Sequence, residues 1–181
     1  MPEMSLREYA KACAPYYLNP GFLYVAEQPT ALRTVLGSCV SVCLHDKRLR
    51  YGGMNHFLLP ESPERERTGR YGRPAIQALL RAFIDFGSHK PDLVAHLVGG
   101  AGMAVDSQSQ KIGQMNAQIA RDLLNRYGIP IVSEDVGGVI GRKVLFLTER
   151  NQLVVFKLDK IREADFYDYQ DRSRTNDGSP D

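Results

Sequence analysis

The feature that most constrains this chain is the order of its short apolar segments. Extended patterns bounded by turn residues come first, at 22–26, 32–36, 39–45 and 51–59. Two stretches repeat their apolar residues every three or four positions and predict helices over 74–86 and 109–126. Further strands are predicted at 93–98, 129–133, 143–147 and 153–158. The chain therefore combines a β-rich first half with helices and strands that alternate along the second.

Length and composition favour one soluble domain. The 181 residues exceed a typical domain only slightly, and 43% of them are hydrophobic. The formal net charge of +2 disfavours nucleic acid as a partner. No apolar run is long enough to span a bilayer and the start lacks a secretory signal, so we expect a cytoplasmic protein without membrane insertion. We expect an N-terminal extension over 1–21, a folded domain over 22–162 and a disordered tail over 163–181.

The three cysteines, Cys13, Cys39 and Cys43, have to be interpreted one by one. Their number is odd, and their spacings match neither a disulfide-rich scaffold nor the paired ligands of a structural zinc site. Cys43 would lie about 13 Å from Cys39 along an extended strand, too far for a disulfide. We therefore expect no metal site and predict that Cys43 packs in the core.

The most informative segment runs from Leu36 to Pro60, because it places a cysteine and a histidine on the two arms of a predicted hairpin. With the turn centred between residues 47 and 48, Cys39 would face His56, with Cβ atoms about 4.5–5.5 Å apart. A neighbouring imidazole is what a thiol needs to become a nucleophile. The segment therefore predicts a cysteine–histidine dyad.

Gly37 and Ser38 come just before the cysteine and would let a turn present backbone N–H groups to a reacting oxygen. Such donors form an oxyanion hole in acyl-transfer enzymes. The alternative interpretation is that Cys39 is a buried small apolar residue and His56 an ordinary residue at a strand edge. The pattern alone leaves both interpretations open.

Two motifs in the second half have a structural interpretation. The glycine-rich segment 99–102 lacks the spacing of a phosphate-binding loop, and close backbone packing explains it as well. Asp135 precedes two glycines, and accepting backbone hydrogen bonds in a turn is a simpler role for it than acid catalysis. Neither motif predicts chemistry of its own.

Four strings of residues, in order, resemble one known family. LGSCVSVCLHD, GGMNHFLLP, VGGAGM and SEDVGG are similar to the chemoreceptor glutamine deamidases, the CheD family of bacterial chemotaxis, over residues 22 to 158. The resemblance implies an α/β sandwich, a single domain in which a mixed β-sheet packs with about two main helices on one side. It also implies that Cys39 is the catalytic nucleophile and His56 the general acid/base.

The family's third active-site residue, a threonine six residues before the cysteine, is not matched here. That position is Arg33, and Thr34 follows one residue later. In a regular strand Thr34 would point to the opposite face from Arg33, so its role as a third member is left open.

The activity that the resemblance implies is hydrolysis of a linear amide: chemoreceptor glutamine side chains become glutamate through a thioester on Cys39, with release of ammonia and without a metal or organic cofactor. Hydrolysis of receptor glutamate methyl esters is a companion activity of the same chemistry. The implied partners are the cytoplasmic part of methyl-accepting chemotaxis receptors and a CheC-type phosphatase.

A cysteine protease or acyl transferase would use the same dyad. From another class, the alternative is a non-catalytic docking module for receptors or the phosphatase. The residues that bind the substrate are not identified.

Overall fold

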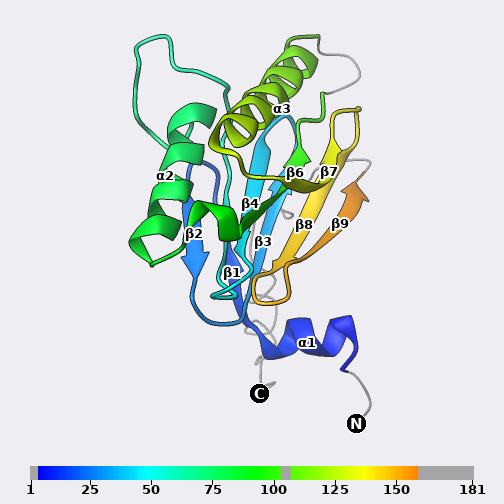
Figure 1. Ribbon diagram of the computed structural model, residues 1–181. Coiled ribbons are helices and arrows are strands. Elements are labelled where there is room, and N and C mark those ends of the chain that lie inside the picture. Colours follow the sequence, from blue (N-terminus) through cyan, green and yellow to red (C-terminus); the bar gives the residue numbers. More distant parts are fainter. Residues whose placement is uncertain (1–3, 103–106, 159–181) are drawn as a thin grey trace, which may run out of the picture.

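The computed structural model describes residues 4–102 and 107–158, which form a layered sandwich (Figure 1). The described helices are α1 (Leu6–Ala12), α2 (Gly72–Asp85) and α3 (Ser107–Tyr127), with a short 3-10 turn at Lys90–Asp92. The strands are β1 (Ala14–Tyr17), β2 (Leu23–Ala26), β3 (Thr30–Leu36), β4 (Val40–Asp46), β5 (Gly52–Asn55), β6 (Leu93–Gly99), β7 (Ile131–Val136), β8 (Gly141–Leu147) and β9 (Gln152–Leu158). Both predicted helices are confirmed.

The strands are divided between two sheets. One has four strands in the order β1-β3-β8-β9, and the other has five in the order β2-β5-β4-β6-β7. Each sheet is mixed, because β1 runs parallel to β3 and β6 runs parallel to β7. The α/β class is confirmed, but the single mixed sheet that the resemblance implies is replaced by two. The chain leaves the first sheet after Leu36 and enters the second at Val40, so the intervening residues 37–39 connect the sheets.

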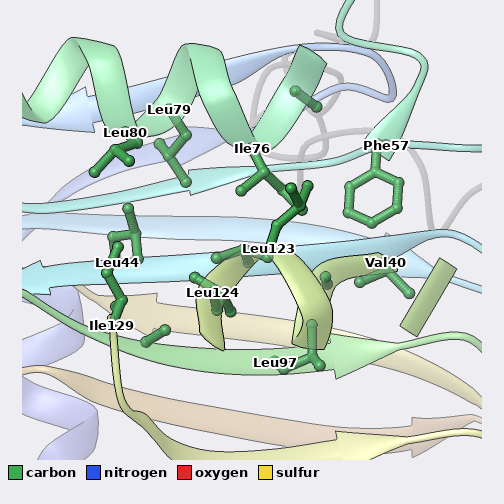
Figure 2. Packing of buried hydrophobic residues seen from close by; sticks show 14 of the residues in the cluster. Val40, Leu44, Phe57, Ile76, Leu79, Leu80, Leu97, Leu123, Leu124 and Ile129 are labelled. Carbon is green, nitrogen blue, oxygen red and sulfur yellow. The ribbon is translucent and has the colours of Figure 1, made fainter. Parts of the chain in front are cut away.

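Two apolar layers lie on the two faces of the five-stranded sheet. Strand β4 contributes side chains to both layers, because Val42 faces the helices and Cys43 faces the four-stranded sheet. Figure 2 shows the layer under α2 and α3, where helix and strand residues meet: Val40, Leu44, Ile76, Leu79, Leu97, Leu123 and Leu124. The layer between the sheets contains Leu32, Leu36, Cys43, Met54, Val98 and Phe146. Side chains of β3, β4 and β5 that point away from the helices therefore gather between the two sheets.

The first residues of the described chain form α1 and β1, which the sequence analysis does not predict. Ser5 caps α1, and its hydroxyl and the Glu8 carboxylate form a reciprocal capping box. Strand β1 pairs with β3, aligning Ala14 with Thr30. The four-stranded sheet thus begins inside the segment interpreted as an N-terminal extension, 1–21. The predicted tail, 163–181, lies outside the described residues.

Candidate active site

Cys39 lies at the end of the connection between the two sheets. Its side chain is partly buried and packs against the apolar layer between them. Immediately after it, Val40 and Phe57 exchange two backbone hydrogen bonds, with N···O distances of 3.1 and 3.0 Å. This pair aligns the two arms of the hairpin next to the thiol.

The predicted register of the hairpin is wrong by two residues. Strands β4 and β5 align Cys43 with Met54 and Val40 with Phe57, so that Cys39 falls opposite Leu58. His56 becomes its diagonal neighbour. Because a shift of two residues preserves the alternation of side chains, His56 still shares a face with Cys39. Diagonal partners lie about 7–8 Å apart, within reach of an aromatic ring.

The physical reason for the shift is the turn. Asp46 Oδ1 accepts hydrogen bonds from the backbone N–H groups of Arg48 and Leu49, both at 2.8 Å, and Arg50 adopts a left-handed φ of 59°. The loop closes where the Asp46 N–H donates to Tyr51 O at 2.9 Å. Residues 47–50 therefore form the loop, and its centre lies one residue later than predicted.

Thr34 and His56 meet between the two sheets. The Thr34 hydroxyl lies 2.8 Å from His56 Nδ1 and donates to Leu18 O, also at 2.8 Å, and both side chains are buried. Because its proton goes to Leu18, the hydroxyl accepts from His56, which places the imidazole proton on Nδ1. Arg33 lies on the opposite face of β3, as alternation requires. Thr34, rather than Arg33, is therefore the residue of β3 that orients His56.

The second ring nitrogen, Nε2, is left as an acceptor. Among the described residues, it is buried and has no hydrogen-bond partner. Burial lowers the pKa of His56 to about 4, so the ring is neutral at pH 7. Burial also raises the pKa of the Cys39 thiol to about 11, an effect that a hydrogen bond from its own backbone amide opposes. The resting site thus holds a neutral thiol and a neutral imidazole with a free lone pair.

This protonation state predicts how Cys39 reacts with iodoacetamide. We expect the alkylation rate to rise about tenfold per pH unit from pH 7 and to be still rising at pH 9, because the thiolate fraction follows a pKa near 11. Cys13 and Cys43 are buried, so peptide mass spectrometry should find the label at Cys39 first. A rate that levels off near neutral pH would instead indicate a thiolate–imidazolium pair.

The backbone around Cys39 is held at three successive carbonyls. Gly37 O accepts from Ala101 N–H at 2.8 Å, Ser38 O from Asn116 Nδ2 at 2.9 Å, and Cys39 O from Gly100 N–H at 2.8 Å. The glycine-rich segment 99–102 thus packs directly against this connection. A Cβ on Gly99 would lie 2.3 Å from Cys39 O, which confirms close backbone packing as the role of the glycines.

Asn116 is the residue of this group that sequence reasoning missed. It lies on α3 and is fully buried, although its neighbours in the helical stripe are apolar. A polar residue in an apolar stripe was the available signal, because buried polar groups require partners.

A hollow of about 190 Å³ adjoins the segment that packs on Cys39. Its lining comes from that segment, from α3 and from the β7–β8 turn: Gly100, Gly102, Gln110, Gln114, Gly137, Gly138 and Val139. Asp135, near the end of β7, pairs with Arg142 at 2.9 Å and Lys157 at 2.8 Å, in place of the predicted backbone contacts. The described residues contain no group of side chains suited to hold a metal ion.

The neutral His56 makes stability depend on pH. Between about pH 6.5 and pH 4 the unfolded chain binds a proton that the folded chain does not, so stability falls as the pH is lowered, by up to about 3 kcal/mol. Burial also lowers the pKa values of His45 and His96, which adds to the loss. Urea unfolding at pH 7 and pH 5 measures the effect. His56→Gln should reduce the difference, and a variant with the pH dependence of the wild type contradicts the assignment.

A thiol and a neutral, oriented imidazole on one face of an α/β sandwich are the groups that thiol-dependent hydrolases use. The family model described as CheD chemotactic sensory transduction matches residues 58–157, and this chain belongs to the CheD family. The matched residues begin after Cys39 and His56, so this match covers neither side chain. In the described chain, no helix is long and apolar enough to cross a membrane.

Curated relatives carry the same family name. One from Anaeromyxobacter dehalogenans (strain 2CP-C), named probable chemoreceptor glutamine deamidase CheD 1, is 46% identical over 134 residues, which cover 74% of this chain and 78% of the relative. One from Stenotrophomonas maltophilia (strain K279a), named probable chemoreceptor glutamine deamidase CheD, is 38% identical over 149 residues, covering 82% and 75%. One from Xanthomonas campestris pv. campestris (strain B100), with that same name, is 39% identical with the same coverage.

Proposed function

We propose that this protein is a chemoreceptor glutamine deamidase that hydrolyses glutamine side-chain amides with Cys39 as nucleophile and His56 as general acid/base. The observation that carries the proposal is the hydrogen bond that His56 Nδ1–H donates to the Thr34 hydroxyl, which leaves the free lone pair of Nε2 on the face that Cys39 shares. Membership of the CheD family supplies the substrate class.

The first half-reaction forms a thioester. The Cys39 sulfur attacks the carboxamide carbon while its proton passes to His56 Nε2. The carbon–nitrogen bond of the tetrahedral intermediate then breaks, and the same proton goes to the departing nitrogen, which leaves as ammonia. Because the proton is handed on within the site, a thiol of high pKa needs no permanent thiolate.

The second half-reaction hydrolyses the thioester and regenerates the free enzyme. Water attacks the thioester carbon and gives a proton to His56 Nε2, and the carbon–sulfur bond then breaks as that proton returns to the Cys39 sulfur. The product is a glutamate side chain, whose carboxyl proton is taken up by the released ammonia. The N–H groups of Ser38 and Cys39 serve as oxyanion donors, because the carbonyls on the same peptides are held by Ala101 and Asn116. Gly37 contributes its carbonyl to this arrangement.

The partners follow from the same proposal. The substrate is the cytoplasmic part of a methyl-accepting chemotaxis receptor, which places the enzyme in the cytoplasm. A glutamate methyl ester presents the same acyl carbon and is a second substrate of the thioester route. A CheC-type phosphatase is the proposed regulatory partner.

Thr34 provides a graded test of the mechanism. Thr34→Val removes the acceptor that keeps the proton on His56 Nδ1, so we expect kcat to fall about tenfold to hundredfold. Thr34→Ser keeps the hydroxyl and should retain most of the wild-type kcat. Arg33→Ala is the matched control on the same strand, and it should leave kcat within about threefold. Steady-state ammonia release measures all three variants. A Thr34→Val enzyme with normal kcat contradicts the role given to this hydrogen bond.

The proposed function is tested by incubating the wild-type protein with a purified receptor cytoplasmic fragment and mapping glutamine-to-glutamate conversion by peptide mass spectrometry. We expect conversion at a few defined glutamines with matching ammonia release, and no conversion after alkylation of Cys39. A fragment that binds the protein without being converted would refute the enzymatic function and favour a docking module.

A further inference from the structure

We propose that Asn116 is a positioning residue of this enzyme: it holds the Ser38–Cys39 peptide so that the Cys39 N–H faces the reacting oxygen. The inference rests on the proposed function. Asn116 belongs to α3, whereas the other residues of the site lie in β3 or directly beside β4 and β5. Its effect would pass through the backbone of the nucleophile, because its side-chain amide contacts carbonyls of the site.

The first observation is that one side-chain amide bridges the two arms of the hairpin. Asn116 Nδ2 donates to Ser38 O and to Leu58 O, each at 2.9 Å. Leu58 is the residue opposite Cys39. Beyond the Val40–Phe57 pair, the two arms present carbonyls, which cannot bond to each other. The NH₂ group of Asn116 supplies a donor to each and continues the pairing where the backbone no longer can.

The second observation is the geometry of a trans peptide. Its C=O and N–H groups point in opposite directions, so holding Ser38 O toward α3 turns the Cys39 N–H away from the helix. Gly37 O is held by Ala101, which fixes the Ser38 N–H in the same way. Within the described chain, neither N–H donates to a backbone carbonyl. Two adjacent N–H groups that no backbone carbonyl of the described chain takes up thus lie beside the thiol.

The third observation is how closely α3 approaches this loop. One turn before Asn116, a Cβ on Gly113 would lie 2.4 Å from Gly100 O, so the helix reaches this depth only because that position has no side chain. The approach leaves Asn116 Oδ1 buried with no partner among the described residues. An unsatisfied buried oxygen is unfavourable for stability. This residue is therefore better explained by the position it gives to the Ser38–Cys39 peptide.

The test separates oxyanion stabilisation from nucleophile reactivity. Asn116→Ala removes both N–H donors of the side-chain amide, and Asn116→Asp leaves at most one O–H donor. Asn125→Ala, at an exposed position of the same helix, is the matched control. We expect kcat for glutamine deamidation to fall about 10²–10³-fold in both Asn116 variants, with KM within about threefold of wild type. Alkylation of Cys39 by iodoacetamide forms no oxyanion. Its rate in the Asn116 variants should therefore stay within about twofold of the wild-type rate at each pH.

A second measurement keeps the proposal testable if a variant is unstable or if the receptor fragment is not a substrate. A receptor peptide in which an aldehyde replaces the glutamine carboxamide adds to Cys39 as a thiohemiacetal, and its oxygen occupies the same site. Its affinity should fall in Asn116→Asp, the isosteric variant, by a factor similar to kcat. Alkylation that slows in proportion to kcat, or unchanged kcat and aldehyde affinity, would overturn the proposal. No deamidation by the wild type refutes the function instead, and the aldehyde affinities then decide the role of Asn116.

Discussion

Cys39→Ala is expected to abolish deamidation of a receptor fragment, with a loss of at least about ten-thousandfold in kcat. The reason is that the proposed thioester route requires a sulfur at this position, and the imidazole and N–H donors alone supply only a small part of the rate enhancement. Ammonia release and peptide mass spectrometry measure the loss. The variant should still fold, because the Cys39 side chain is partly exposed.

The matched control for this prediction is Cys43→Ala. Cys43 lies four residues further along the same arm, on the same face, but it is fully buried in the layer between the sheets. We expect this variant to lose about 1–2 kcal/mol of stability and to keep its kcat. Residual activity of Cys39→Ala close to that of wild type, or loss of kcat in Cys43→Ala alone, would show that the wrong thiol has been assigned.

His56→Gln should lower kcat by about 10³–10⁴-fold, because it removes the proposed carrier of the proton from the thiol to the leaving nitrogen, the unpartnered Nε2. Glutamine keeps most of the volume and a polar end, so the loss reflects proton transfer more than packing. In the wild type, the acid limb of the kcat profile should lie near pH 4, where His56 gains its proton. An acid limb near pH 6.5 would indicate an imidazole that is not buried during turnover.

His45→Gln is the control for that substitution. His45 is also buried in β4, and burial also lowers its pKa, but its Nδ1 lies 2.9 Å from Thr148 O, away from the thiol. We expect a lower unfolding midpoint with kcat within about threefold of wild type. If both histidine variants lose activity equally, the loss reports damage to the sheet, and the role of His56 as the proton carrier is contradicted.

How far the sequence predicts this protein depends on whether a feature is local. Apolar periodicity is local, so both main helices and most strands from residue 23 onward are found within two or three residues of their predicted limits. The exception is β5, which ends at Asn55, four residues before the predicted end. The capping box formed by Ser5 and Glu8 is local too, and this pair was the available signal for α1. The hairpin register was missed because the turn depends on bonds from the Asp46 side chain, and no periodicity reports them.

The residues around His56 show the other limit. The sequence places Thr34 on one face of its strand, but it does not show what that face contacts. The contact with His56 forms only because the four-stranded sheet packs on the five-stranded one. Asn116 is separated from Ser38 by 78 positions, and a single asparagine in a helix does not indicate which carbonyls it will meet. Contacts of this kind depend on tertiary packing, which pattern analysis of one sequence does not give.

The connection at residues 37–39 has a consequence for how activity relates to folding. Thr34 comes from one sheet, His56 from the other, and Cys39 from the segment between them, so no single sheet contains the site. An intermediate that keeps its strands but has lost close packing between the layers would separate these groups. Enzymatic activity therefore reports the contact between the sheets, and it should disappear before the secondary structure does.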